Sequence, residues 1–285
     1  MPNRRGFLVK SAALAASFLT GLTGCHDVKG QRMQEIKIDL GKDIVETARG
    51  SGVPEFQAQK VNNTIIYSVT AIPPHRPVRF TRSGYEIVWQ PAFGLNIYGS
   101  ALRGSIADSA SISLDSNLTS HVAAQAFVEQ TIAQFAKGKW QRYHDPVWDV
   151  LLTGRSSMLD VAGQIATTVM TIDPAYKVPT ADWPVLAKSG PIWRWVGDGV
   201  LASLTVGFAE RETSTVPQYS MDLEFELLDI YTKRLAENGD QKRKEGDAKG
   251  WNSTAKYEAG KKERAELNKR LIANAIKRGD QVVPR

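Results

Sequence analysis

The sequence predicts an α+β fold, in which mainly antiparallel sheets carry packed helices and a charged helical extension ends the chain. Short runs with every second residue apolar indicate half-buried strands. One longer run repeats its apolar residues at helical spacing, and the chain from residue 233 onward is rich in charge. With 285 residues, 42% of them apolar, and seven tryptophans, the chain is long enough to bury a sizeable core.

The first half is expected to consist of strands joined by turns. Ile36, Ile38 and Leu40 alternate with polar residues, which indicates a strand. The stretch 63–72 is rich in β-branched residues and stops at Pro73, because proline removes a donor from the ladder. The remaining expected strands are 78–81 and 85–90, which form a hairpin around the polar turn 82–84, and then 95–98 and 111–114.

An amphipathic helix follows these strands. Apolar residues recur at steps of three to five positions through Lys137, and Gly138 supplies a stop. We therefore expect the helix to pack on the sheet. The apolar positions are Leu118, Val122, Ala126, Phe127, Ile132 and Phe135.

The second half shows a similar order of elements. In 219–227, Met221, Leu223 and Phe225 alternate with acidic residues, so the carboxylates of Asp222, Glu224 and Glu226 are expected on the solvent side of a strand rather than in acid–base catalysis. Two similar sheet-plus-helix units, 36–140 and 141–232, are compatible with this order. The other expected elements are strands at 167–172 and 200–209 and a short helix or turn at 181–188.

The basic extension, 233–285, holds fifteen Lys and Arg against eight Asp and Glu. Breaks are expected at Asn238-Gly239, Gly246 and Gly250, followed by a final helix from an N-cap at Ser253 to about Arg278. The extension is either a solvated helix or a surface for an acidic partner or an anionic membrane, and nucleic acid is not an expected partner. Its thin apolar stripe predicts docking at one edge of the body: Leu267, Leu271 and Ala275.

The N-terminus has the parts of an export signal. Arg4 and Arg5 precede an apolar stretch, 11–22, which is too short to cross a bilayer. The ending Leu22-Thr23-Gly24-Cys25 resembles the lipobox of bacterial lipoproteins, which implies that Cys25 is lipidated after cleavage of 1–24 and that 25–35 is a tether. The paired arginines also resemble a twin-arginine motif, although Val9 loosens it, so the export route stays open.

Cys25 is the sole cysteine, which excludes intramolecular disulfides, thiolate metal clusters and a cysteine nucleophile. A lipid anchor facing the periplasm is the use that remains for it. In lipoproteins an Asp directly after the cysteine often signals retention at the inner membrane. This chain has His26 there, so the resemblance favours the outer membrane over the inner one.

Several common catalytic motifs are missing: the sequence lacks Gly-x-Ser-x-Gly, His-Glu-x-x-His, a Walker loop and Gly-x-Gly-x-x-Gly. We therefore predict that the protein is not an enzyme and that it uses no cofactor or metal. The alternative is an envelope hydrolase or solute-binding lipoprotein with an unrecognised site around Arg155, Ser156 and His144. That alternative requires the three side chains to meet in one concave pocket.

Tryptophans gather between residues 140 and 195. The pattern Trp193-Arg194-Trp195 places two indoles on one face of an extended segment. These rings either belong to the core or form a protein-binding surface, where Trp and Arg are enriched. The candidates for partner binding are the exposed members of the set Trp140, Trp183, Trp193, Arg194 and Trp195.

Scattered short motifs between residues 126 and 250 resemble bacterial lipoproteins encoded beside type VI secretion lipase effectors. The resemblance rests on segments 126–142, 152–157, 173–176, 182–183 and 195–202. Those lipoproteins are thought to be immunity proteins. The resemblance implies a lipoprotein facing the periplasm that binds and neutralises a secreted antibacterial lipase or phospholipase. A structural lipoprotein that tethers an envelope assembly is a further alternative.

Overall fold

The computed structural model describes residues 35–53, 55–73, 76–114, 118–166, 170–211 and 214–284, and all of them belong to one compact unit. The predicted signal peptide, Arg4, Arg5 and Cys25, and the tether up to residue 34 lie outside the described residues. Among the residues described, no helix is both long and apolar enough to span a membrane.

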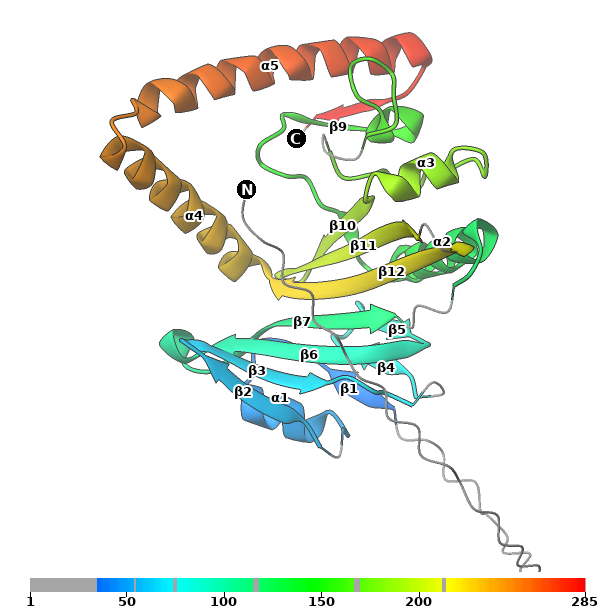
Figure 1. Ribbon diagram of the computed structural model, residues 1–285, viewed down its shortest axis with the longest axis vertical. Coiled ribbons are helices and arrows are strands. Elements are labelled where there is room, and N and C mark those ends of the chain that lie inside the picture. Colours follow the sequence, from blue (N-terminus) through cyan, green and yellow to red (C-terminus); the bar gives the residue numbers. More distant parts are fainter. Residues whose placement is uncertain are drawn as a thin grey trace, which may run out of the picture. The chain divides into compact units, whose positions relative to one another are not determined.

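The predicted α+β class is confirmed, and its centre is one eight-stranded sheet (Figure 1). Every pair of neighbouring strands in this sheet is antiparallel. In spatial order the strands are β2 (Gln57–Val61), β3 (Thr64–Val69), β6 (Ala92–Ser100), β7 (Ala107–Leu114), β12 (Ser214–Leu227), β11 (Val200–Arg211), β10 (Ile192–Gly197) and β8 (Gln141–Arg142).

The two halves of the chain contribute four strands each, in the same order from the edge to the centre. β2, β3, β6 and β7 come from the first half, and β8, β10, β11 and β12 come from the second. The last strands of the two halves meet, with Ala110 of β7 opposite Phe225 of β12. The two units suggested by the sequence are thus joined into a single continuous sheet, which buries one shared core.

A smaller sheet contains β1 (Ile36–Ile38), β4 (Val78–Phe80) and β5 (Ile87–Trp89), which confirms the first predicted strand and the hairpin. The helix α1 (Ile44–Gly50) follows β1 in the chain, and the short 3-10 helix η1 (Ala101–Arg103) joins β6 to β7. Strand β2 was not predicted, because it is exposed along its whole length and therefore shows no apolar alternation. The sequence feature that could have indicated β2 is Asn62, because asparagine tolerates the left-handed backbone conformation (φ +54°) that this residue adopts in the turn between β2 and β3.

The amphipathic helix is α2 (His121–Lys137), and the Ser120 hydroxyl accepts a hydrogen bond from the N–H of Ala123 at its N-terminus (3.1 Å). It begins three residues later than the apolar pattern suggested. At 3.6 residues per turn, Val122 and Ala126 lie on the side of the helix away from Phe135, so these two expected core positions are exposed. The buried residues of α2 are Ala124, Gln125, Val128, Thr131 and, as expected, Phe135.

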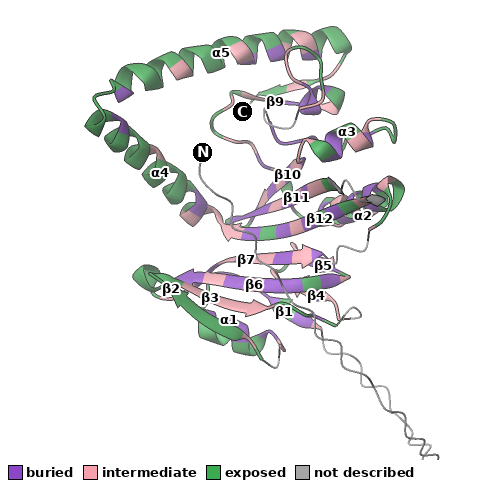
Figure 2. Ribbon diagram, viewed as in Figure 1, coloured by how far each residue is buried: buried purple, intermediate pink, exposed green. Residues whose placement is uncertain are grey.

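The main core lies against one face of the large sheet, as the buried positions in Figure 2 show. That face is covered by α2, by α3 (Trp183–Lys188) and by the small sheet, whose Phe80 stacks on Phe225 of β12 at 4.1 Å between ring centroids. Of the expected strand 167–172, the first three positions lie outside the described residues. Met170 and Ile172 are buried, but the backbone at residues 170–172 is irregular and does not form a strand, so the strand prediction is wrong there.

The extension consists of α4 (Leu228–Ala248) and α5 (Ser253–Arg278), which meet at a corner (Figure 1). The expected breaks at Asn238-Gly239 and Gly246 are wrong, because α4 runs through them and ends just before Gly250. Asn252, not Ser253, accepts the capping hydrogen bond of α5.

The predicted apolar stripe of α5 does contact the body. Leu271 and Ala275 are buried with Leu152 and Met170 in a small cluster separate from the main core. Beyond α5, β13 (Val282–Pro284) pairs with β9 (Val150–Leu152), which precedes the 3-10 helix η2 (Gly154–Met158). The extension is therefore held to the body at its C-terminal end.

Candidate functional site

The four candidate tryptophans are core residues. Trp183 and Trp193 are 1% exposed, Trp195 is 3% exposed and Trp140 is 8% exposed. Trp193 and Trp195 share one face of β10, as predicted, but that face is the buried one, where Trp195 stacks on Phe135. Of the two alternatives left open by the sequence, the core one holds for these four tryptophans, so none of their rings is exposed to anchor a partner.

Arg194 alone of that set points away from the main core. Its place between two buried neighbours on β10 directs it to the opposite face of the sheet. There it lines a depression together with Tyr231, and its buried Nε has no hydrogen-bond partner among the described residues.

The three residues of the enzyme alternative make separate contacts. His144 Nε2 lies 3.1 Å from the carbonyl oxygen of Trp148. The Arg155 guanidinium donates to Asp182 (3.2 Å). Ser156 is 2% exposed, and its hydroxyl accepts from Arg278 at 3.4 Å. No hydrogen bond links any two of these three described residues, so the geometry expected of a nucleophile beside its base is not seen.

A more extensive polar surface lies on the outer face of the central strands, opposite the main core. Ser111 of β7 is in register with Asn96 of β6 on one side and with Glu224 of β12 on the other. Glu224 in turn is opposite Ser203 of β11, which is opposite Arg194 of β10. One unbroken row of polar side chains therefore crosses five strands. We call this surface the outer polar face.

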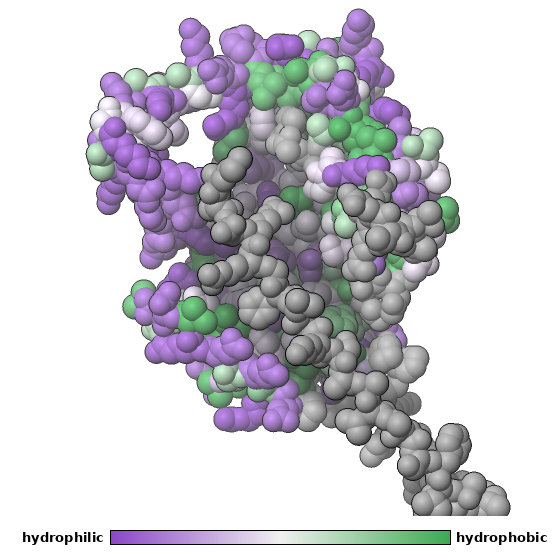
Figure 3. Space-filling view, in the orientation of Figure 1, coloured by the Kyte–Doolittle hydropathy of each residue, from purple (hydrophilic) through white to green (hydrophobic). Residues whose placement is uncertain are grey.

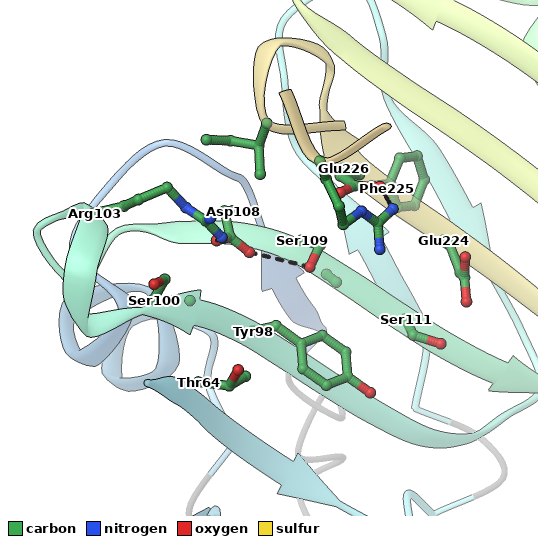
Figure 4. A pocket seen from close by; sticks show the side chains of 14 residues that line it. Thr64, Tyr98, Ser100, Arg103, Asp108, Ser109, Ser111, Glu224, Phe225 and Glu226 are labelled. Carbon is green, nitrogen blue, oxygen red and sulfur yellow. Dashed lines mark hydrogen bonds and ion pairs between the residues drawn. The ribbon is translucent and has the colours of Figure 1, made fainter. Parts of the chain in front are cut away.

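The outer polar face is hollowed by a depression of about 430 Å³. Figure 4 shows Tyr98, Ser109, Ser111 and Glu224 projecting into it from three neighbouring strands. A second depression of about 250 Å³ contains Arg194, Ser203, Thr205 and Tyr231. Both depressions share Glu224, Glu226 and Arg234, so they form one continuous surface bordered by the first turns of α4.

Two ion pairs stand at the rim of the larger depression. Arg103 donates to Asp108 at 2.7 Å, and Arg234 of α4 donates to Glu226 of β12 at 2.7 Å. Both arginines remain partly exposed, with 38% and 56% of their side-chain surface accessible, whereas the carboxylates are largely covered. The arrangement leaves guanidinium edges accessible at the surface while their counter-ions hold them in place.

The titration of the floor residues follows from their partial burial. Burial raises the pKa of the Tyr98 phenol, and the nearby carboxylates of Glu224 and Asp222 raise it further. Tyr98 is therefore a neutral hydroxyl at physiological pH and can donate a hydrogen bond. Burial also raises the pKa of Glu226, while Arg234 acts in the opposite direction. The outer polar face thus offers several hydrogen-bond donors and acceptors.

No cluster of three or more His, Cys, Asp or Glu side chains able to hold a metal ion is found among the described residues. Comparisons of the chain with known protein families, with curated proteins and with solved structures yield no match.

Asp222, Glu224 and Glu226 were expected on the solvent side of a strand, and the alternation along β12 confirms that they lie on the face opposite the core. The outer polar face itself was not predicted as a surface. The signal was present in β7, where Ser109, Ser111 and Ser113 alternate with buried apolar residues. Only the pairing of β7 with β12 turns two separate polar patterns into one face.

Proposed function

We propose that this protein is a periplasm-facing lipoprotein that binds a secreted antibacterial lipase or phospholipase and neutralises it, with the outer polar face as the contact surface. The observation that carries the proposal is the continuous row of polar side chains across five strands, which ends at Arg194 and is flanked by Tyr98 and Arg234. The lipobox-like ending at Cys25 and the resemblance to immunity lipoproteins support the compartment and the kind of partner.

The physical character of the face suits protein recognition. Tyrosine and arginine are enriched at the centres of protein interfaces, because each combines a large contact area with directional hydrogen bonds. Residues on paired strands are already ordered, so binding costs little conformational entropy. A neutralising protein must outcompete substrate for the effector, which favours a dissociation constant on the order of nanomolar, or about −12 kcal/mol.

A solute-binding function is the second candidate, and the larger depression favours it. Its volume of about 430 Å³ is within the range of small-ligand pockets. Its lining of Tyr98, Ser109, Ser111 and Glu224 would select a polar or cationic solute. If this second function is correct, Tyr98→Ala should abolish binding of the solute. The parent chain should then give no protection against a lipase.

The proposal is tested by co-expressing the chain with the lipase-type effector encoded beside it and measuring survival and binding kinetics. Glu224 is exposed and in no ion pair among those seen in the described residues, so Glu224→Arg changes the face without leaving a buried charge. We expect Glu224→Arg and Tyr98→Ala each to weaken binding by about 2 kcal/mol, roughly thirtyfold, and to reduce protection. The matched control is Lys60→Glu, a charge reversal on the exposed strand β2.

Unchanged binding by Glu224→Arg and Tyr98→Ala, alongside a wild-type complex, would exclude the outer polar face as the contact surface. If the wild-type chain forms no complex and deletion of its gene leaves the cell insensitive to the effector, the immunity function itself is wrong.

A further inference from the structure

The corner between α4 and α5 presents an exposed indole. Trp251 lies in the turn that joins the two helices and is 52% exposed, in contrast to the buried tryptophans of the core. Tyr257, in the second turn of α5, is 54% exposed. The surface formed by α4 and α5 is mainly hydrophilic in Figure 3, so these rings are isolated aromatic groups on a charged surface.

Specific contacts build this corner. The Ser253 hydroxyl donates to the carbonyl oxygen of Arg243 (3.0 Å), and the backbone N–H of Ser253 donates to the Asp247 carboxylate (3.1 Å). Gly246 is buried where the two helices approach, and any side chain there would collide with Ser253. The N–H of Trp251 donates to the carbonyl oxygen of Gly246 (2.9 Å). The turn therefore fixes the backbone at Trp251, and the indole ring borders Gly246 on one side while remaining 52% exposed.

Cations surround both rings. The Lys256 ammonium lies 3.7 Å from the centroid of the Trp251 ring, and that of Lys249 lies 5.6 Å from it. The Arg243 guanidinium lies 5.6 Å from the centroid of Tyr257. Between residues 242 and 264 the chain carries eight Lys and Arg against four Asp and Glu. The corner thus combines projecting aromatic rings with a local excess of positive charge.

We propose that the α4–α5 corner, residues 242–264, docks on the anionic phospholipid surface of a membrane, with Trp251 at the level of the headgroups. Indole rings favour the membrane–water boundary, where the ring is partly desolvated and its N–H stays hydrated. Lysines beside the ring then face lipid phosphates, and each contributes attraction that salt screens. This docking would add a second membrane contact to the expected lipid anchor, and it is independent of the proposed lipase partner.

Binding to lipid vesicles tests this inference. The mature chain, residues 25–285 with Cys25→Ser, therefore lacks both the predicted signal peptide and the lipid, and it is added to phosphatidylcholine vesicles and to mixed phosphatidylglycerol–phosphatidylcholine vesicles. We expect binding to the anionic vesicles alone, and weaker binding as salt is raised. The double variant Lys249→Gln/Lys256→Gln should bind at least tenfold more weakly, based on about 1 kcal/mol for each cation near the surface. A blue shift of the tryptophan emission on binding should disappear in Trp251→Phe while most of the binding remains.

Matched controls separate the corner from general charge and exposure. Lys42→Gln/Lys60→Gln removes two exposed lysines elsewhere, and Phe93→Ala removes a ring that is 53% exposed on β6. Both should bind vesicles like the parent chain. The inference is overturned if the parent chain does not bind anionic vesicles, or if the corner variants bind as tightly as the controls. It is also overturned if those variants lose affinity only for an acidic protein partner.

Discussion

Arg234 of α4 donates a hydrogen bond from Nη2 to Oε2 of Glu226 at 2.7 Å, and this ion pair joins the start of the helical extension to the central strand β12. Glu226 keeps only 17% of its side-chain surface exposed, whereas Arg234 keeps 56%. The pair therefore places a largely covered carboxylate under a partly solvated guanidinium, at the point where the two depressions of the outer polar face meet.

The protonation of Glu226 should make stability depend on pH. Burial raises its pKa above the ordinary 4.5, so the folded state binds this proton more tightly than the unfolded state. The stabilisation that comes from this bound proton is fully present below pH 4.5, and it is lost as the pH rises through the raised pKa of Glu226 in the folded state. We expect the free energy of unfolding of the parent chain to fall across that window relative to Glu226→Gln, as measured by urea unfolding at a series of pH values. Glu55→Gln, on an exposed residue, is the control.

Removing the Arg234 side chain should change the pH at which Glu226 loses its proton. Arg234 is the largest influence that lowers the pKa of Glu226, so Arg234→Met should raise that pKa further. The chemical shift of the Glu226 side chain, followed by NMR across the pH range, reports it directly. A titration that moves to lower pH in Arg234→Met would contradict this assignment of charges.

Truncation of Trp195 should test the structural role of the buried indoles. The ring is 3% exposed and stacks on Phe135 of α2 at 3.8 Å between centroids. Trp195→Ala is expected to reduce the free energy of unfolding by about 3–5 kcal/mol, because it removes a large buried side chain and leaves a cavity. Phe93→Ala, on an exposed ring, should change it by no more than about 0.5 kcal/mol. Equal effects of the two variants would contradict the burial described above.

Gly154 should be essential for attachment of the C-terminal end of α5. Its φ is +58°, and a Cβ there would collide with the carboxylate of Asp280, which accepts from the N–H of Ser156 at 2.8 Å. Gly154→Ala should cost about 1–2 kcal/mol for backbone strain, plus about 1–3 kcal/mol for the overlap. Gly41→Ala is the control, because Gly41 has φ +92° and open space around it. Hydrogen exchange should show loss of protection in α5 for Gly154→Ala alone.

Cys25→Ser should release the chain from the membrane. Lipid chains on the N-terminal cysteine would contribute about 0.8 kcal/mol for each buried methylene, and several chains together anchor a protein firmly. Fractionation at high salt, which suppresses any docking of the α4–α5 corner, measures the anchor by itself. Retention of a normally processed Cys25→Ser chain in the membrane fraction under these conditions would refute the lipoprotein assignment.

The purified chain should not hydrolyse ester, phosphodiester or glycan substrates. Ser156 and His144 make separate local contacts, so neither has the other as an activating partner. Turnover assays on the parent chain, Ser156→Ala and His144→Ala provide the measurement. Robust turnover that either substitution abolishes would establish the enzyme alternative.

The sequence predicted most strands with strong alternation, because a strand with one buried face repeats its apolar residues every two positions. Strand β12 and the hairpin of β4 and β5 are examples. The same signal failed for β2, which buries neither face. It misplaced the buried face of α2 by including Val122 and Ala126, because steps of three to five residues do not all return to the same face of a helix.

By itself, the sequence determined the α+β class, the alternation of carboxylates with core residues on β12, and the charge of the extension. These are local properties, set by residue type and spacing along the chain. The tertiary structure alone decided that the indoles of Trp193 and Trp195 face the core and that Arg194 faces outward. It also decided that Ser111 and Glu224 are neighbours. Such relationships depend on which strands pair and which face a helix covers, and contacts between distant segments determine both.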